Sequence, residues 1–373
     1  MSAHPAGRYR VAGPDDAPAL CAMLRDNPMA GPVTLGLERA PDYFAAARLF
    51  GQDTSIIAET AAGDPVCMYG CGLWDSYLNG APRRCAYLHG LRVNAAYRHQ
   101  LRWLRDGFAC IPRLVPHFAQ AHGCFTSVAS DNSTARRLLE AGVKGMPHYQ
   151  PQGEMVTLLL PTRQGCCRGL RCARHDLLLR RARQADVPAL LALHRRYAER
   201  WQFAPCLDAH WLLNLTPAHG LALDDFWLME QDGALRFCAA LWDQRHCKQT
   251  VVRGYSGALA RLRPLYNLWA QAAGRVPLPA AGARVEHVFI AFAVFDGTPE
   301  LMLRCIGELL AHAARMQASS AALGLSAQHP LLDAVQQRFH AQHYRTCIET
   351  VSWPGEDAPA LDGRPVQPEV ALL

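Results

Sequence analysis

The hydrophobic pattern of the chain divides it into two successive runs of elements with a similar order. In the first run, apolar stretches with the two-residue period of strands alternate with stretches that have the period of helices. Strands are predicted over 54–60, 66–74, 84–93, 124–129 and 154–160, the last of which closes the first unit. Helices are predicted over 101–122, interrupted near Pro112 and Pro116, and over 132–141, which ends at Gly142.

The second run repeats this outline. A hairpin is predicted for 225–230 and 235–241, because Asp232-Gly233 between them favours a two-residue turn. Further strands are predicted over 249–255, 284–295, 321–325 and 347–353, and helices over 186–201, 299–317 and 330–339. The order of elements predicts an α/β protein of the mixed, α+β kind, with two tandem units that each have a central mixed sheet flanked by helices.

A short internal repeat supports the division into two units. At an offset of 170 residues, seven positions of 10–22 carry the same residue as their counterparts in 180–192. They are Arg10, Ala12, Asp16, Pro18, Ala19, Leu20 and Ala22 in the first copy, and Arg180, Ala182, Asp186, Pro188, Ala189, Leu190 and Ala192 in the second. Each copy predicts a short strand, an aspartate that caps the helix, and a proline in the first helical turn.

Composition and repeat together give the domain limits. The units are predicted at 1–160 and 177–355, with a linker at 161–176 and a tail at 356–373 that wraps the surface. The linker contains a cluster of possible metal ligands, Cys166, Cys167, Cys172 and His175. Their spacing lacks the two separated ligand pairs of a zinc site, so no metal is predicted.

The overall composition excludes several classes of protein. Half the residues are hydrophobic and 19% are charged, which excludes a disordered chain. The net charge of +6 is spread along the chain rather than clustered, so no nucleic-acid partner is predicted. No apolar run reaches the ~18 residues of a membrane span, and no membrane partner is predicted. Residues 1–13 lack the apolar core of a secretory signal, and the 14 cysteines are interpreted as reduced, which favours a cytoplasmic location.

Two segments of the first unit carry recognisable motifs. The first is a strand that runs into a turn before a helix, Leu91-Arg92-Val93-Asn94-Ala95-Ala96-Tyr97-Arg98. The second has Asn132, Ala135, Leu138 and Gly142 within Ser130-Asp131-Asn132-Ser133-Thr134-Ala135-Arg136-Arg137-Leu138-Leu139-Glu140-Ala141-Gly142. In residue type and spacing, these two segments resemble the GNAT superfamily of acyl-CoA-dependent N-acetyltransferases. The resemblance covers most of 8–160, and covers 178–354 by the order of elements. It implies acetyl-CoA, or another acyl-CoA, as a cosubstrate, and no metal.

The resemblance also implies which residues hold the cosubstrate. They are Leu91, Arg92, Val93, Arg98, His99, Gln100, Leu101, Arg102, Trp103 and Asn132. A helix start presents free amides and a positive dipole end to a pyrophosphate. The family loop usually has small residues where this chain has Leu101 and Trp103. The backbone there either still binds phosphate, with Arg98, Arg102 and Arg105 adding charge, or is blocked by these two side chains.

The sequence motifs indicate the residues that would transfer protons less clearly. The family often has a tyrosine where this chain has Leu139, so Tyr149 or a water would have to protonate the leaving thiolate. Strand alternation places Tyr87, His89, Leu91 and Val93 on one face, and His89 and Tyr87 are the candidate bases. Their alternative role is that of packed, hydrogen-bonded strand residues. Glu59 is a weaker candidate base.

The second unit has fewer candidate residues. Its corresponding turn has one glycine and no arginine, and Asp296 would repel a pyrophosphate, so this unit is predicted to be a degenerate copy. The polar segment 242–255 either lines an acceptor pocket, with Asp243 and Arg253 as anchors, or is an exposed strand and turn. His246 and Cys247 are adjacent on an extended strand, face opposite ways, and are not interpreted as a nucleophile pair.

Two hypotheses of function follow. The first is an acyl-CoA-dependent N-acyltransferase that moves an acetyl group to a small-molecule or peptide amine, with the first unit active. The alternative is a catalytically impaired relative that binds a ligand or partner with the same fold. The protein is expected to be a monomer or a homodimer.

Overall fold

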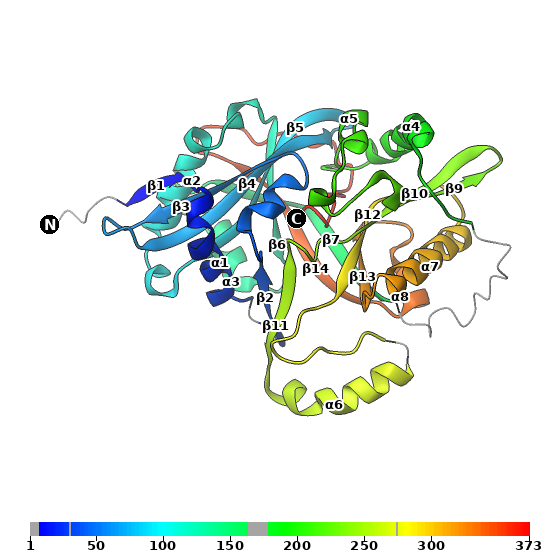
Figure 1. Ribbon diagram of the computed structural model, residues 1–373. Coiled ribbons are helices and arrows are strands. Elements are labelled where there is room, and N and C mark those ends of the chain that lie inside the picture. The colour runs from blue at the N-terminus through cyan, green and yellow to red at the C-terminus, as the bar shows by residue number, and fades with distance from the viewer. Residues whose placement is uncertain (1–6, 30, 163–177, 274) are drawn as a thin grey trace.

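The computed structural model describes residues 7–29, 31–162, 178–273 and 275–373. Their main feature is a twelve-stranded mixed sheet with the order β1-β3-β4-β5-β6-β14-β7-β13-β12-β10-β9-β8 (Figure 1). The predicted α+β fold with a mixed sheet and flanking helices is therefore confirmed. The linker residues Cys166, Cys167, Cys172 and His175 lie outside the described residues.

Within the described residues, the first half of the chain supplies seven strands and three α-helices. Its strands are β1 (Arg8–Val11), β2 (Val33–Glu38), β3 (Gln52–Glu59), β4 (Pro65–Leu78), β5 (Ala81–Val93), β6 (Gly123–Ala129) and β7 (His148–Pro161). Its helices are α1 (Ala17–Asp26), α2 (Arg102–Leu114) and α3 (Ser133–Glu140). Helix α1 packs on one face of the sheet through Leu20 and Met23. Helix α2 packs on the other face through Leu104 and Phe108, so the sheet is covered on both sides.

The second half supplies the remaining strands and helices. Its strands are β8 (Arg180–Arg181), β9 (Phe226–Gln231), β10 (Ala234–Trp242), β11 (Gln249–Tyr255), β12 (His287–Phe295), β13 (Ser320–Ser326) and β14 (Gln342–Ser352). Its helices are α4 (Val187–Ala198), α5 (Ala209–Leu213), α6 (Gly257–Ala272), α7 (Pro299–Arg315) and α8 (Leu332–Phe339). The predicted hairpin is confirmed, because Asp232 and Gly233 have φ of 53° and 72° between β9 and β10.

The internal repeat produces the same ionic cluster twice. Asp16 accepts a hydrogen bond from Arg10 at 2.6 Å, and Asp186 accepts one from Arg180 at 2.7 Å. In the first copy Glu59 on β3 also pairs with Arg10, and in the second copy Glu230 on β9 also pairs with Arg180. The prediction that the aspartates cap the following helix is wrong. Each carboxylate instead reaches back to the amide three residues before it, at 2.7 and 2.8 Å.

The two halves exchange their last strands. Strand β14 lies between β6 and β7, and β7 pairs with β13 from Pro161↔Ser320 to Met155↔Ser326. The prediction that residues 154–160 close the first unit is therefore wrong, because β14 completes that part of the sheet and β7 completes the other. A period-2 pattern predicts a strand but carries no information about its partner, so sequence reasoning assigned β7 to its nearest neighbours.

The end of the C-terminal tail, residues 366–373, is part of the core. Val366 and Ala371 are 1% and 0% exposed, and Val370 is 8% exposed. The backbone of Gln202 pairs with the tail through the amide of Gln202 to the carbonyl of Pro365, at 2.9 Å. The prediction that 356–373 wraps the surface agrees with residues 356–365, none of which is buried, and is wrong for 366–373. The apolar residues of that last part lie among prolines and an acidic residue and gave no periodic signal.

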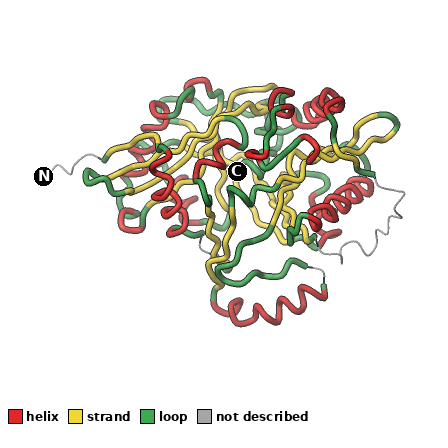
Figure 2. The backbone as a smooth tube through the Cα atoms, viewed as in Figure 1, coloured by secondary structure: helices red, strands yellow, loops and turns green. Residues whose placement is uncertain are grey.

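A second, two-stranded sheet was not predicted as such. Strand β11 matches the predicted 249–255, but it pairs with β2, which the sequence analysis missed, from Gln249↔Glu38 to Tyr255↔Val33. Helix α6, also missed, follows β11 and projects from the main body at the end of this ribbon (Figures 1 and 2). The ribbon joins the first half to the second.

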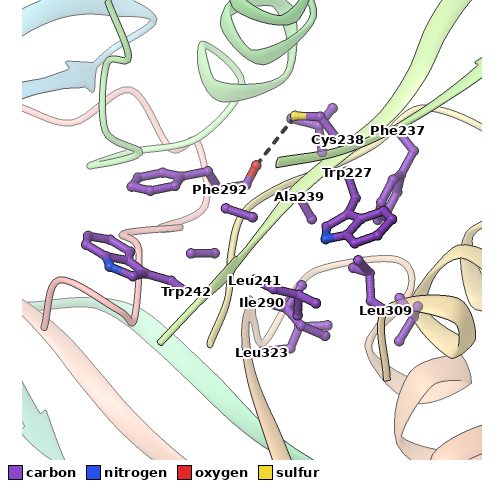
Figure 3. Packing of buried hydrophobic residues seen from close by; sticks show 14 of the residues in the cluster. Trp227, Phe237, Cys238, Ala239, Leu241, Trp242, Ile290, Phe292, Leu309 and Leu323 are labelled. Carbon is purple, nitrogen blue, oxygen red and sulfur yellow. Dashed lines mark hydrogen bonds between the residues drawn. The ribbon is translucent and has the colours of Figure 1, made fainter. Parts of the chain in front are cut away.

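The largest hydrophobic cluster among the described residues lies mainly in the second half, and strand β7 of the first half also contributes to it. The Trp242 and Phe292 rings stack there with centroids 5.6 Å apart, and both side chains are almost fully buried (Figure 3). The Cys238 thiol beside them donates to the Phe292 carbonyl at 3.7 Å. Every cysteine among the described residues is a free thiol, and most are buried. None of the described helices combines the length and the apolar character needed to cross a membrane.

Candidate functional site

The sheet opens between β5 and β6. These strands pair in parallel from Cys85↔Gly123 to Leu88↔Thr126 and no further. Beyond Leu88, β5 stays with β4 up to Val93, while β6 follows β14 on its other side. Each of the two strands therefore has one edge that faces the opening and has no sheet partner. The backbone N–H and C=O groups of such edges are available to a ligand.

A β-bulge bends β5 at this opening. His89 pairs with Gly70 and Arg92 with Met68, so β5 has one more residue than β4 between these pairs. Gly90 takes up the extra residue with φ of 66°, a conformation that glycine adopts without strain. The bulge shows that the predicted common face is wrong. Tyr87 packs in the cluster of Phe125 and Ile348, whereas Leu91 and Val93 pack on the opposite side with Leu88.

His89 is held by an aspartate on β3. Its Nε2 lies 2.9 Å from Oδ1 of Asp53, and the two side chains are 14% and 12% exposed. The imidazole lies against Gly70, where any Cβ would come within 2.3 Å of the ring. Because Asp53 accepts the proton of Nε2, the arrangement favours the tautomer in which Nδ1 has a free lone pair. A base needs such a lone pair.

The charges around this pair favour an ionised Asp53. Burial alone would raise the pKa of Asp53, but His89, then Arg39 and Lys248, lower it to about 2. Arg39 directly follows Glu38 and Lys248 directly precedes Gln249, so both residues lie next to the Glu38↔Gln249 pair of the ribbon. Burial, and then the charge of Arg39, lower the pKa of Lys248 to about 8.

Tyr87 is placed differently from His89. Its ring stacks on His89 with centroids 5.5 Å apart, and its hydroxyl lies 2.6 Å from Oγ of Ser127. The side chain is 3% exposed, and burial raises the pKa of Tyr87 well above its usual range. Of the two candidate bases, Tyr87 therefore fits the packed, hydrogen-bonded alternative. Glu59 lies at the other end of β3 from Asp53 and pairs with Arg10.

The start of α2 lies just beyond the end of β5. The Trp103 side chain is 4% exposed and packs against Tyr9 and Tyr97, and its Nε1 donates to Gln100 at 3.1 Å. Its bulk therefore points into the protein. Among the described residues, the amides of Leu101, Arg102 and Leu104 donate to no backbone or side-chain acceptor. These amides can bind an anion together with the helix dipole.

The predicted basic residues differ in what they already bind. Arg98 fastens the turn to the end of α1, since its Nη2 donates to Asn27 at 2.5 Å and its Nε to the Val93 carbonyl at 3.2 Å. Arg102 donates to Gln100 at 2.9 Å, and Arg105 pairs with Asp106. His99 is exposed. Arg92 donates to the Leu91 carbonyl at 2.8 Å, and burial lowers its pKa.

Helix α3 begins on the other side of the opening. Asn132 caps it by accepting a hydrogen bond from the amide of Ala135 at 3.1 Å, so its side-chain oxygen is engaged, and the residue is exposed. Leu139 is buried among the residues beneath α3. Tyr149 packs edge-on against Phe108 with centroids 6.2 Å apart, and burial raises the pKa of Tyr149 well above its usual range.

The second half has a matching opening that the tail fills. Strands β12 and β13 pair only from His287↔Ser320 to Phe289↔Ala322, and a bulge follows at Phe292, with φ of 52°. Gln367 accepts the amide of Ser326 at 2.5 Å and donates to the carbonyl of Gly324 at 3.0 Å. Glu369 accepts the amide of Phe292 at 2.6 Å. The tail thus binds both free strand edges of this opening.

The other candidates of the second half bind partners of their own. Asp296 pairs with Arg236 at 3.3 Å and Asp243 with Arg245 at 2.7 Å. Arg253 pairs with Glu38 on the ribbon. Asp243 and Arg253 therefore do not converge on one pocket. Within the described residues, no group of three or more His, Cys, Asp or Glu side chains has an arrangement that suits a metal ion.

Sequence reasoning missed three residues of the first opening. They are Asp53, Gly70 and Gly90. Asp53 stands just before the predicted strand 54–60, a position that carries no special signal. An isolated glycine within a strand does indicate a bulge or a close approach, and this signal was present at Gly90 and Gly70.

Comparison with known proteins identifies the fold. No protein-family model matches the sequence, and no curated protein matches it either. Among solved structures, the chain is similar to Saccharomyces cerevisiae N-myristoyltransferase with bound myristoyl-CoA, with a TM-score of 0.60 and 9% identity over 98% of this chain and 90% of that one. It is also similar to a GCN5-related N-acetyltransferase from Sphaerobacter thermophilus, with a TM-score of 0.53 and 12% identity over 94% and 97%.

A third similar structure is a GCN5-related glucosamine N-acetyltransferase region of a fungal multi-domain GH3 β-N-acetylglucosaminidase. Its TM-score is 0.57 and its identity 11%, over 94% of this chain and 38% of that one. These likenesses span both halves of the chain. They confirm the GNAT fold that the sequence motifs indicated.

Proposed function

We propose that the protein is an acyl-CoA-dependent N-acyltransferase whose reaction takes place at the opening between β5 and β6. One observation carries this proposal. The first opening is bordered by the His89–Asp53 pair and by a helix start with free amides, whereas the tail fills the second. In a fold shared with N-acyltransferases, one open and equipped site supports transfer by the first half alone.

The residues at the opening fit an acyl-CoA. The unpaired edges of β5 and β6 match the amide groups of its pantetheine arm, and the free amides of Leu101, Arg102 and Leu104 match its pyrophosphate. The guanidinium group of Arg102 adds positive charge at the same helix start. Trp103 does not block this end, because its side chain is buried behind the helix.

Acyl-CoA supplies an acyl group on a thioester, which an amine nitrogen can attack. We assign His89 to take the proton that the nitrogen loses, on its Nδ1, while the bond from carbon to nitrogen forms and the bond from carbon to sulfur breaks. Asp53 holds the imidazole in the required tautomer and stabilises its positive charge. The electron pair of the broken bond leaves with the CoA sulfur.

The acyl group we propose is acetyl. The rings of Trp74, Tyr87, Phe125 and Phe203 form a continuous packed row beside His89, with centroids of successive rings at most 5.7 Å apart. This row leaves little room for a long chain on that side. The acceptor is a small-molecule or peptide amine, and we place it on the His89 side. A cytoplasmic site of action agrees with the free thiols among the described residues.

A second candidate function is a binding module without turnover. The observation in its favour is that Leu139 stands where the family often has a tyrosine, and that the hydroxyl-bearing Tyr149 packs in the interior. Such a protein would bind an acyl-CoA or another ligand in the same opening.

Two measurements on the full chain separate these functions. Calorimetry with acetyl-CoA tests binding, and release of free thiol across a panel of amines, with acyl chains of increasing length, tests transfer. Binding with turnover is the expected result. Binding without thiol release would favour the module. No binding at millimolar acyl-CoA would contradict the transferase and would leave only a module for another ligand.

A further inference from the structure

Helix α6 is attached to the protein by one of its faces. Asn267 exchanges two hydrogen bonds with the backbone of Leu278, at 2.9 and 2.8 Å, and Tyr266 accepts one from Gln342 on β14 at 2.8 Å. Ala270 on the same face is fully buried. These contacts fix the orientation of the helix at the end of the β2–β11 ribbon (Figure 1).

The opposite face of α6 carries large apolar side chains in water. Leu262, Leu265, Leu268 and Trp269 are 53%, 65%, 67% and 50% exposed. With 100° between successive helical residues, they form one stripe about 120° wide. Isolated exposed leucines are common on proteins, but a continuous apolar stripe on a helix that projects from the body marks an interaction surface.

The charge around the stripe is of one sign. From residue 254 to residue 285 the chain has four arginines, Arg261, Arg263, Arg275 and Arg284, and no Asp, Glu or Lys. Arg261 is exposed within the stripe, and the guanidinium group of Arg275 lies 4.9 Å from the Trp269 ring centre. The surface that covers this stripe must therefore tolerate leucine side chains and supply negative charge.

We propose that α6 lies on an anionic lipid surface. The leucines and Trp269 would enter the boundary between headgroups and acyl chains, and Arg261 and Arg275 would bind the lipid phosphates. A second copy of α6 fits less well, because two such stripes would bring like charges together. The expectation of no membrane partner rested on the lack of a spanning segment, which does not bear on a helix lying in the interface. This inference does not depend on the proposed acyl transfer.

Co-sedimentation of the full chain with vesicles tests the inference. Vesicles of phosphatidylcholine alone are compared with vesicles that contain 30% phosphatidylglycerol, at low and at 0.5 M salt. At least about tenfold tighter binding to the anionic vesicles is expected, and it weakens with salt. Equal binding to both vesicles, or none to either, would overturn the proposal.

Substitutions locate the binding surface. The double variant Leu262→Glu with Leu268→Glu is expected to reduce binding at least about tenfold, as two acidic groups enter the stripe. The matched control is Leu213→Glu on α5, a leucine that is 47% exposed away from α6 and should leave binding unchanged. An equal loss in both variants would contradict the assignment. A dimer that dissociates in the double variant, without vesicle binding by the parent protein, would show a second copy as the occupant instead.

Discussion

Nε2 of His89 and Oδ1 of Asp53 lie 2.9 Å apart, and they join two strands that are not neighbours in the sheet. Strand β4 lies between β3 and β5, and it permits the contact because Gly70 leaves the imidazole its space. The pair lies where β5 loses its partner β6. A basic nitrogen with a fixed tautomer is thus placed at the edge of the opening.

Removal of either member of this pair should reduce transfer. His89→Ala is expected to lower kcat by about 10²–10³-fold, the usual contribution of a general base, with a smaller change in KM for acyl-CoA. Asp53→Asn should lower kcat by about tenfold or more, because the amide no longer stabilises the imidazolium. Thiol-release kinetics measure both effects.

The control for this pair is Asp64→Asn, since Asp64 lies in an exposed turn at the other end of β3. It should leave the kinetic constants unchanged. A His89→Ala variant with the parent kcat would exclude His89 as the base.

The strands and helices of the central GNAT pattern were predictable, because each has a clear hydrophobic period. The bulge at Gly90 was not predicted, although a glycine within a strand indicates a bulge. A bulge reverses which side chains share a face, so the placement of Leu91 and Val93 beside Tyr87 failed at this residue. His89 and Asp53 are 36 residues apart, and no local pattern reports such a contact.

The exchange of strands between the two halves could not be predicted from local sequence patterns either. Strand pairing depends on which edges are free in the folded sheet, so nothing in the sequence of β14 shows that it lies between β6 and β7. The same holds for the tail, whose Gln367 and Glu369 bind strand edges that exist only because β12 and β13 separate. The expectation that the second half is a degenerate copy rests on its turn before α7, and it stays a prediction.

Gly90 should be required for activity, and its substitution should reduce activity by more than the loss of stability explains. Gly90→Ala places an L side chain at φ of 66°, which costs about 1–2 kcal/mol, although nothing lies within 4 Å of the added carbon. The strain is expected to flatten the bulge and lower kcat/KM for acyl-CoA by about tenfold or more. Urea unfolding and thiol-release kinetics measure the two effects separately.

Gly63→Ala is the matched control for this variant. Gly63 lies in the turn before β4 with φ of 90° and equally open space, so its loss of stability should be comparable. Its activity should be that of the parent protein. Equal losses of activity in the two variants would show that strain alone, and not the bulge, explains the effect.

The packing of the C-terminal tail against β13 should require that residue 324 has no side chain. A Cβ there would come within 2.2 Å of Val370, so Gly324→Ala overpacks the second opening and should destabilise the protein by about 1–3 kcal/mol in urea unfolding. Gly13→Ala, whose added carbon meets nothing within 4 Å, should change the stability by less than about 0.5 kcal/mol. A stable Gly324→Ala protein would contradict the close packing of the tail.

Glu369 should make the stability depend on pH. Burial raises the pKa of Glu369 from 4.5 to about 7, and the amides of Ala371 and Phe292 offset this only in part. Between these values the unfolded chain releases the proton while the folded protein keeps it. The free energy of unfolding should therefore fall as the pH rises from 4.5 to 7, by roughly 2–3 kcal/mol in total, because each pKa unit corresponds to about 1.4 kcal/mol.

Glu369→Gln isolates this contribution, because the amide is neutral at every pH. Urea unfolding of both proteins at pH 5 and pH 8 gives two differences in stability, in which the other titrating groups cancel. The loss of stability between pH 5 and pH 8 should be smaller in the variant by roughly 2–3 kcal/mol. The same loss in both proteins would mean that Glu369 is ionised in the folded state, held as a carboxylate by its two backbone donors.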